Sequence, residues 1–217
     1  MNGVLEQTSL RSYSMLLWDF DGVIKESVDV KSDAFERLFA PFGAAVAERV
    51  RRHHECNGGL SRYQKLPLYL EWAGVEPTDA EVARYEALFS SAVRQAVIDC
   101  AWVPGAREYL QAHHEEQYMA VVTATPQGEI EHILRALGIA HFFREVHGAP
   151  RSKADGIVSA LARARCGCDK ALLIGDSNTD RQAAAAADVA FLLRRTPLNR
   201  SLQREYAGPQ CENFADE

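Results

Sequence analysis

Short apolar runs alternate with stretches of helical periodicity over the second half of the chain. The apolar runs at 118–123, 144–148, 171–175 and 189–193 predict strands. The stretches between and around them, 103–116, 126–137, 154–165 and 179–187, predict helices. Together with a first apolar run that ends at Trp18, this alternation predicts a parallel sheet with helices on both faces. Ligands of such sheets bind outside the carboxyl ends of the strands.

Residues 28–100 contain no run that reads as a strand, and their apolar positions recur with helical spacing. Helices are predicted over 31–42, over 61–72 with an interruption at Pro67, and from a capping box at Thr78 to about residue 97. The predicted fold is α/β, a doubly wound, Rossmann-like parallel sheet with a small helical domain inserted after the first strand. We assign 14–24 and 101–195 to the core, 25–100 to the insertion, and no function to 196–217.

Composition narrows the classes of partner. The chain has 217 residues and a formal net charge of −6, which argues against a nucleic-acid partner because such proteins carry a basic surface. It has no run of about 18 apolar residues that could span a membrane, and residues 1–14 lack the features of a signal peptide. Its five cysteines lack paired spacing and are interpreted as reduced thiols. We therefore predict a cytoplasmic monomer or small homo-oligomer with neither a nucleic-acid nor a membrane partner.

Two carboxylates follow the first apolar run. Asp19 and Asp21 stand two residues apart, so an extended chain points both side chains to the same side, and Gly22 permits a sharp turn after them. Two like charges held this close repel each other, and a bound metal ion or a shared proton relieves the repulsion. An Asx-rich turn is the simpler interpretation of the pair taken alone.

Other strand ends supply matching groups. Thr123 ends one predicted strand, Asp176 follows another, and Lys153 lies in the loop before a predicted helix. A phosphate ester requires such a set, because an anionic nucleophile must approach a dianionic phosphoryl group and positive charge must neutralise the repulsion. Carboxylates and a backbone carbonyl suit Mg²⁺, which prefers oxygen ligands. Thr125 is an alternative source of the hydroxyl, and Arg151 is an alternative source of the cation.

The sequence resembles the haloacid dehalogenase superfamily over residues 14–194. The resemblance rests on four motifs in order: the DxDGV of 19–23, the apolar run that ends at Thr123, Lys153, and the GDSxxD of 175–180. The helical insertion resembles the C1-type cap of this superfamily, a helical bundle that closes over the site.

The resemblance implies a role for each motif residue. Asp19 would be the nucleophile that forms an aspartyl-phosphate, and Asp21 would be the general acid and base. Dehalogenases lack this second aspartate, so phosphoryl transfer is favoured over carbon–halogen cleavage. The phosphate would be bound by Thr123, Ala124 and Lys153. The Mg²⁺ ligands would be Asp19, the backbone carbonyl of Asp21, Asp176 and, directly or through water, Asp180.

A basic, glycine-containing loop of the insertion is the candidate for substrate specificity. Its residues are Arg52, His53, Asn57, Gly59, Ser61 and Arg62. In an acidic protein such a patch suggests an anionic or polyhydroxylated leaving group, although charged helix faces are commonly just solvated. The loop also looks like the specificity loop of C1-capped members, including beta-phosphoglucomutases. Glu26 and Ser27 lie where the cap hinge is expected, and we assign them no chemistry.

The leading prediction is an Mg²⁺-dependent phosphatase that hydrolyses a small phosphorylated metabolite, either a sugar phosphate or a phosphoglycolate-like compound. A phosphomutase of the beta-phosphoglucomutase type would use the same motifs. Phosphonate cleavage would need a Schiff base on a cap lysine, for which Lys31 and Lys65 are the candidates. A non-catalytic binding protein on the same fold is the remaining alternative.

Overall fold

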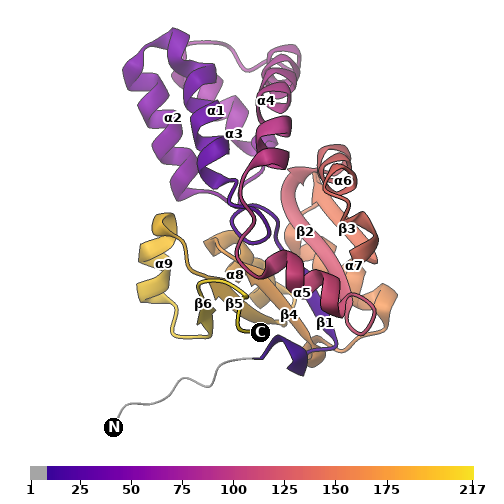
Figure 1. The fold of residues 1–217 in the computed structure, drawn as a ribbon. Coiled ribbons are helices and arrows are strands. Elements are labelled where there is room, and N and C mark those ends of the chain that lie inside the picture. The colour runs from indigo at the N-terminus through magenta and orange to yellow at the C-terminus, as the bar shows by residue number, and fades with distance from the viewer. Residues whose placement is uncertain (1–8) are drawn as a thin grey trace.

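Six parallel strands form the central sheet of the computed structural model, which describes residues 9–217 (Figure 1). The strand order is β3-β2-β1-β4-β5-β6. The strands are β1 (Met15–Trp18), β2 (Tyr118–Pro126), β3 (Glu145–Ala149), β4 (Ala171–Gly175), β5 (Ala190–Arg194) and β6 (Gln210–Cys211). The predicted α/β fold with a parallel sheet is confirmed. One strand differs in length: β2 continues three residues past the predicted end at Thr123, so Thr125 also belongs to it.

Helices cover both faces of the sheet. Successive side chains of β1 point to opposite faces, so its apolar residues are buried under helices on each face. Leu16 and Trp18 join one buried cluster, while Met15 and Leu17 join the other. Helices α5 (Ala106–His113) and α6 (Gln127–Ala136) contribute to the first cluster, and α7 (Lys153–Ala164) and α8 (Asn178–Ala186) contribute to the second. β1 is therefore buried on both faces, and its carboxyl end is held at the centre of the sheet.

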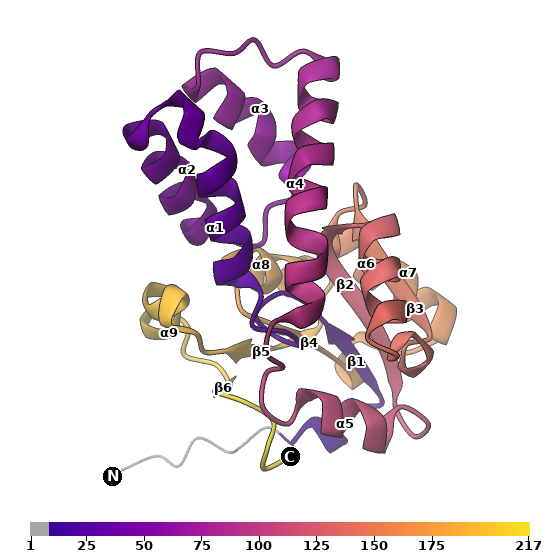
Figure 2. The same cartoon turned by 45° about the horizontal axis from the view of Figure 1, so that its top comes forward.

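The segment between β1 and α5 forms a bundle of four helices beyond the carboxyl ends of the strands (Figures 1 and 2). They are α1 (Val28–Phe39), α2 (Ala44–Cys56), α3 (Arg62–Trp72) and α4 (Asp79–Asp99). Aromatic rings fill the bundle, and the ring centroids of Phe35 and Phe89 lie 3.8 Å apart. The expected interruption at Pro67 is wrong, since α3 is continuous. Pro67 is the sixth of the eleven residues of α3, and the helix continues through it although its ring removes one backbone hydrogen bond.

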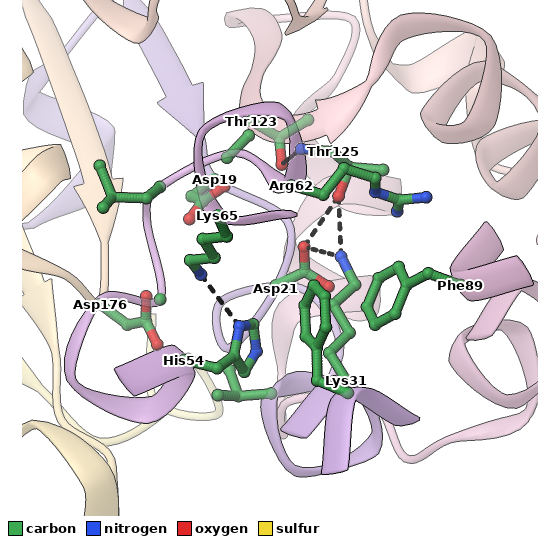
Figure 3. Close-up of a pocket in the computed structure, with 15 residues that line it drawn as sticks. Asp19, Asp21, Lys31, His54, Arg62, Lys65, Phe89, Thr123, Thr125 and Asp176 are labelled. Carbon is green, nitrogen blue, oxygen red and sulfur yellow. Dashed lines mark hydrogen bonds and ion pairs between the residues drawn. The ribbon is translucent and has the colours of Figure 1, made fainter. Parts of the chain in front are cut away.

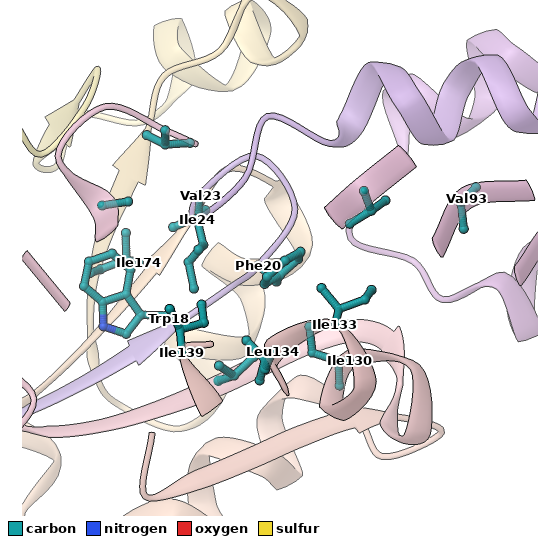
Figure 4. Close-up of a cluster of buried hydrophobic side chains, with 14 of the residues drawn as sticks. Trp18, Phe20, Val23, Ile24, Val93, Ile130, Ile133, Leu134, Ile139 and Ile174 are labelled. Carbon is teal, nitrogen blue, oxygen red and sulfur yellow. The ribbon is translucent and has the colours of Figure 1, made fainter. Parts of the chain in front are cut away.

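One buried cluster joins the sheet to the bundle. Trp18 and Phe20 pack at the end of β1, Ile130 and Ile133 pack on α6, and Val93 extends the same cluster into α4 (Figure 4). All five side chains are shielded from solvent. The bundle therefore rests on α6 through apolar contacts as well as through its two connections to the core.

The C-terminal tail is an integral part of the core. Residues 197–205 form the short helices η5 (Pro197–Asn199) and α9 (Arg200–Glu205), and β6 pairs with β5 at the edge of the sheet. Phe214 packs against Trp18 with a centroid separation of 5.1 Å. These elements are too short to show periodicity, so the sequence analysis left the tail without a structure.

No helix within residues 9–217 is both long and apolar enough to cross a membrane. All five cysteines are unpaired thiols. The expectation that residues 1–14 carry no signal peptide falls largely on residues 1–8, which lie outside the described part of the chain.

Candidate active site

A cavity lies between the carboxyl ends of the central strands and the helical bundle (Figure 3). The sheet side contributes Asp19, Asp21, Thr123, Ala124, Thr125 and Asp176. The bundle contributes Val28, Lys31, Phe35, His54, Gly58, Leu60, Arg62, Lys65 and Phe89. Its volume of about 40 Å³ has room for roughly three water molecules. The bundle thus lies close over the strand ends, and we expect it to move when a larger molecule enters.

Three carboxylates meet on the sheet side of the cavity. Asp19, Asp176 and Asp180 each offer an oxygen, and these oxygens lie within 4.8 Å of one another. Neighbouring strands explain the first two, because Trp18 pairs with Ile174 and the residues after them emerge side by side. Asp180 comes from the first turn of α8, where it bonds to Ser177 in a capping box. This oxygen-rich set fits a hard divalent cation.

Mutual repulsion marks the same cluster. Burial and the charges of Asp19 and Asp180 raise the pKa of Asp176 well above its ordinary value. Burial, together with the charges of Asp180 and Asp21, raises the pKa of Asp19 to about 7, although Lys153 opposes the shift. A cation bound among these carboxylates would offset their mutual repulsion, lower their pKa values and favour the ionised form.

Lys153 is the first residue of α7 and lies against this cluster. Its Nζ is 2.8 Å from Oδ2 of Asp19 and 2.5 Å from Oδ1 of Asp180. Burial disfavours the ammonium, but the charges of Asp180 and Asp19 outweigh burial and raise the pKa of Lys153. The other oxygen of Asp19 accepts a hydrogen bond of 2.8 Å from the backbone N–H of Phe20. Both oxygens of Asp19 are therefore fixed in direction.

Asp21 is held by three donors from separate elements. Its carboxylate accepts hydrogen bonds from Ser27 Oγ at 2.6 Å, Lys31 Nζ at 2.5 Å and Thr125 Oγ1 at 3.0 Å. Burial alone would raise the pKa of Asp21, but the Lys31 charge and these hydrogen bonds lower it below the ordinary value. Ser27 was assigned only a passive hinge position, so its contact with Asp21 is a finding that the sequence analysis missed.

The two threonines of β2 have different roles. Thr125 donates its hydroxyl to Asp21 and accepts a hydrogen bond of 2.8 Å from Lys31 Nζ. The hydroxyl oxygen of Thr123 accepts a bond of 3.3 Å from the Thr125 N–H, which leaves its proton available. Thr123 and its neighbour Ala124 line the cavity, and their role in phosphate binding stays a prediction. Thr125, the alternative hydroxyl, is already engaged.

Arg62 and Gly59 bring the predicted specificity loop into contact with the core. The Arg62 guanidinium forms a two-pronged ion pair with Glu129 of α6, with N–O distances of 2.9 and 2.5 Å. Its carbon Cζ lies 4.7 Å from the Phe89 ring centroid. A Cβ on Gly59 would lie 2.4 Å from Ser177 Oγ, so only glycine allows this close approach to α8.

Of the six predicted loop residues, Arg62 lines the cavity and Gly59 does not, and the remaining four also lie outside it. Arg52 is exposed and pairs with Glu48 on its own helix. His53 Nδ1 shares a hydrogen bond of 3.0 Å with the Tyr69 hydroxyl, and Asn57 donates to the His53 carbonyl. Ser61 caps the start of α3. These side chains support the bundle, and none of them lines the space above Asp19.

Lys31, His54 and Lys65 of the bundle line the cavity but were not predicted as site residues. Lys31 and Lys65 were considered only as candidates for a Schiff base. Each lies on the apolar side of its helix, one helical turn from a buried apolar or aromatic residue. The pairs are Lys31 with Phe35, His54 with Val50, and Lys65 with Tyr69. A polar residue in an apolar stripe is the sequence signal that would have identified them.

The C-terminal tail also supports the site. The Asn199 side chain donates hydrogen bonds to the backbone carbonyls of Asp176 at 2.7 Å and Arg194 at 2.8 Å. Arg194 in turn donates to the Gly22 carbonyl and forms an ion pair with Glu26. These bonds connect the loops that carry Asp176 and Asp21 to the edge of the sheet.

Comparison with known families agrees with this geometry. The model of the haloacid dehalogenase-like hydrolases matches residues 16–193, which is most of the chain. The chain belongs to this family. The predicted superfamily and the predicted enzyme class, a phosphoric monoester hydrolase of the haloacid dehalogenase type, are confirmed.

Curated relatives of the chain are phosphoglycolate phosphatases. The enzyme of Pectobacterium atrosepticum is 30% identical over 195 residues, which cover 84% of this chain and 79% of the relative. That of Pseudomonas savastanoi pv. phaseolicola is 29% identical over 186 residues, or 81% of this chain. The aligned part spans about two thirds (67%) of the Pseudomonas enzyme.

Solved structures share the whole fold at low identity. CbbY from Rhodobacter sphaeroides, a mutant in complex with xylulose-(1,5)bisphosphate, has a TM-score of 0.76 at 18% identity and covers 94% of this chain and 96% of its own. Beta-phosphoglucomutase from Clostridium difficile has a TM-score of 0.75 at 16% identity and covers 94% and 92%. These similarities support the architecture of sheet and helical bundle.

Proposed function

We propose that the protein is an Mg²⁺-dependent phosphatase that hydrolyses small phosphorylated metabolites through an aspartyl-phosphate on Asp19. The observation that carries the proposal is that Asp19 belongs to the carboxylate cluster and also contacts Lys153, while Asp21 lines the same cavity. A nucleophile, a positive charge beside it and a second carboxylate for proton transfer are the groups that this reaction needs.

Mg²⁺ would be held by Asp19, Asp176, Asp180 and the backbone carbonyl of Asp21, and it would neutralise charge on the phosphoryl oxygens. The protein groups then do the rest of the binding. The ammonium of Lys153 and the hydroxyl of Thr123 donate to the phosphoryl oxygens, together with the backbone N–H of Ala124. The ammonium charge and the positively polarised O–H and N–H hydrogens offset the repulsion between Asp19 and the incoming phosphate.

Asp19 attacks phosphorus, a new O–P bond forms, and the bond from phosphorus to the leaving oxygen breaks. Asp21 gives its proton to that leaving oxygen. Water then attacks phosphorus, Asp21 takes the proton from this water, and free phosphate leaves while the Asp19 carboxylate is restored. The contacts from Lys31, Ser27 and Thr125 lower the pKa of Asp21 and favour its carboxylate, which is the form that takes a proton from water in the second step.

We propose a substrate of the size of 2-phosphoglycolate. Every curated relative described above is a phosphoglycolate phosphatase. The closed cavity is small, and closure of the bundle would exclude bulk water and large esters from the strand ends. Phosphorylated proteins would not fit beneath the bundle.

Phosphate release from a panel of esters tests the proposal. The panel contains 2-phosphoglycolate, several sugar phosphates and an aryl phosphate, each with Mg²⁺ and with EDTA. Asp19→Asn removes the nucleophile, and Asp169→Asn is the matched control because Asp169 is exposed far from the cavity. We expect release that needs both Mg²⁺ and Asp19. Metal-independent release, or no release from any ester, would contradict the proposal.

A further inference from the structure

Among the described residues, Lys65 has no carboxylate partner, unlike the other cations at the cavity. Lys31 pairs with Asp21, Arg62 pairs with Glu129, and Lys153 pairs with Asp19 and Asp180, each with an N–O distance of 2.8 Å or less. Within residues 9–217, the hydrogen-bond partner of Lys65 Nζ is Nδ1 of His54, at 2.9 Å. Figure 3 shows the Lys65 amine turned toward this ring among the residues that line the cavity.

His54 does not supply the missing negative charge. Its ring is buried, and burial together with the charges of Lys65 and Lys31 lowers the pKa of His54 well below its ordinary value. The imidazole is therefore neutral at physiological pH, and its Nδ1 accepts a hydrogen bond from the Lys65 amine. It orients the amine of Lys65 without neutralising it.

The surroundings of Lys65 make an unpaired ammonium unfavourable. Only 1% of the residue is exposed to solvent, so water cannot solvate the charge. Lys31 and Lys153 add repulsion, and burial followed by Lys31 lowers the pKa of Lys65 to about 7. A buried charge without a partner destabilises a fold, whereas an anion bound beside it would stabilise both. A bound anion is thus the group that this wall of the cavity lacks.

We infer that Lys65 binds a second anionic group of the substrate, so that the substrate is a phosphate monoester whose leaving group carries a carboxylate or another phosphate. The inference rests on the proposed function and specifies its substrate class. The phosphoryl group that is transferred belongs at the strand ends, beside Asp19 and Lys153. Lys65 projects from α3 on the bundle side of the same cavity, where the leaving group would lie.

Arg62 does not replace Lys65 in this role. Its guanidinium is bonded to Ser90 and forms a buried ion pair with Glu129, so its charge is already neutralised while the bundle is closed. The amine of Lys65 retains donors that point to no other protein acceptor within the described chain. An anionic leaving group therefore finds its free donor at Lys65.

A pair of matched substrates tests the inference. 2-Phosphoglycolate and 2-hydroxyethyl phosphate differ in whether the leaving group ends in a carboxylate or in a neutral hydroxymethyl group. Lys65→Met removes the charge and keeps an apolar chain of similar length. We expect Lys65→Met to raise KM for 2-phosphoglycolate about 10- to 100-fold, and to change kcat/KM for 2-hydroxyethyl phosphate less than about twofold.

Controls separate the possible causes. Lys170→Met alters an exposed lysine and should change neither substrate. Lys65→Arg, which keeps the charge, should recover part of the preference for 2-phosphoglycolate. A bisphosphate substrate in the same comparison shows whether a second phosphate is bound in place of a carboxylate. Equal losses on both matched substrates, or no loss on either, would overturn the inference, since the first indicates a structural role or contact with the transferred phosphate.

The outcome remains informative if the wild-type protein hydrolyses nothing. That result would contradict the proposed function, while binding to Asp19→Asn, measured as a thermal shift, still tests Lys65. We expect 2-phosphoglycolate to stabilise Asp19→Asn more than 2-hydroxyethyl phosphate does, and Lys65→Met to abolish the difference. If Lys65→Met fails to fold, Lys65→Gln carries the same comparison. An unchanged difference in thermal shift would overturn the inference.

Discussion

The two walls of the cavity are charged in opposite senses. The sheet wall gathers Asp19, Asp176 and Asp180 around one lysine, so carboxylates are in excess there. The bundle wall presents Lys31 and Lys65, of which Lys65 has no carboxylate partner. Each wall therefore carries a charge that the protein does not neutralise. We propose that a metal ion completes the first wall and that an anionic leaving group completes the second.

The largest expected effect comes from the sheet wall. Asp19→Asn should reduce phosphate release by about 10³-fold or more, because an amide cannot attack phosphorus. Its melting temperature should not fall, since the substitution removes one of three mutually repelling carboxylates. Circular dichroism and phosphate release measure the two effects together. An active Asp19→Asn protein would contradict the assignment of the nucleophile.

Asp176 tests the metal half of the comparison. Asp176→Asn should weaken the apparent affinity for Mg²⁺ at least about tenfold, measured as the Mg²⁺ concentration that gives half-maximal phosphate release. Excess Mg²⁺ should recover part of the activity. Asp169→Asn again serves as the control. An unchanged Mg²⁺ requirement would show that Asp176 is not a ligand.

Two neighbouring glycines test whether the walls must approach closely. A Cβ on Gly59 would meet Ser177 Oγ at 2.4 Å and Thr179 Cβ at 2.6 Å, whereas a Cβ on Gly58 would meet nothing within 4 Å. Gly59→Ala should therefore hinder closure of the bundle and lower kcat/KM about tenfold, while Gly58→Ala should leave it nearly unchanged. Equal effects of the two substitutions would mean that this contact does not limit closure.

The smallest expected effect concerns the stability of the bundle wall. Lys65→Met should raise the free energy of unfolding by on the order of 1–3 kcal/mol without ligand, because it removes a buried charge that lacks a carboxylate partner. Since 1 kcal/mol corresponds to about 2–4 °C for a chain of this length, the melting temperature should rise by several degrees. A lower melting temperature would indicate that Lys65 stabilises the fold.

The dependence of this gain on pH has a definite sign. The folded pKa of Lys65 is about 7 and its ordinary value is 10.5. Between these values the unfolded chain binds a proton that the folded chain lacks, so the wild-type protein gains stability as pH rises. The advantage of Lys65→Met should be greatest below pH 7 and should shrink toward pH 10. The groups that face Lys65, namely His54, Lys31, Asp21 and Lys153, are present in both proteins. A constant difference in melting temperature would contradict the shifted pKa.

The two walls also differ in how well the sequence predicts them. Asp19, Thr123 and Asp176 follow apolar runs of a parallel sheet, and such strands end at one common edge, so local pattern was enough to bring them together. The bundle wall depends on how four helices pack. The sequence analysis predicted Arg52 and His53 as specificity residues. The packing of the helices places both outside the cavity and places Lys65 in its lining. Periodicity predicts which residues are buried, and it does not say what a buried charge faces.

A structure of Asp19→Asn with Mg²⁺ and 2-phosphoglycolate tests both walls in a single measurement. We predict that the phosphoryl group lies beside residue 19 and Lys153, that the metal ion is bound to Asp176, and that the carboxylate of the ligand lies within hydrogen-bonding distance of Lys65 Nζ. The opposite orientation, with the phosphoryl group on Lys65 and the carboxylate at the strand ends, would contradict it, and so would a ligand bound outside the cavity.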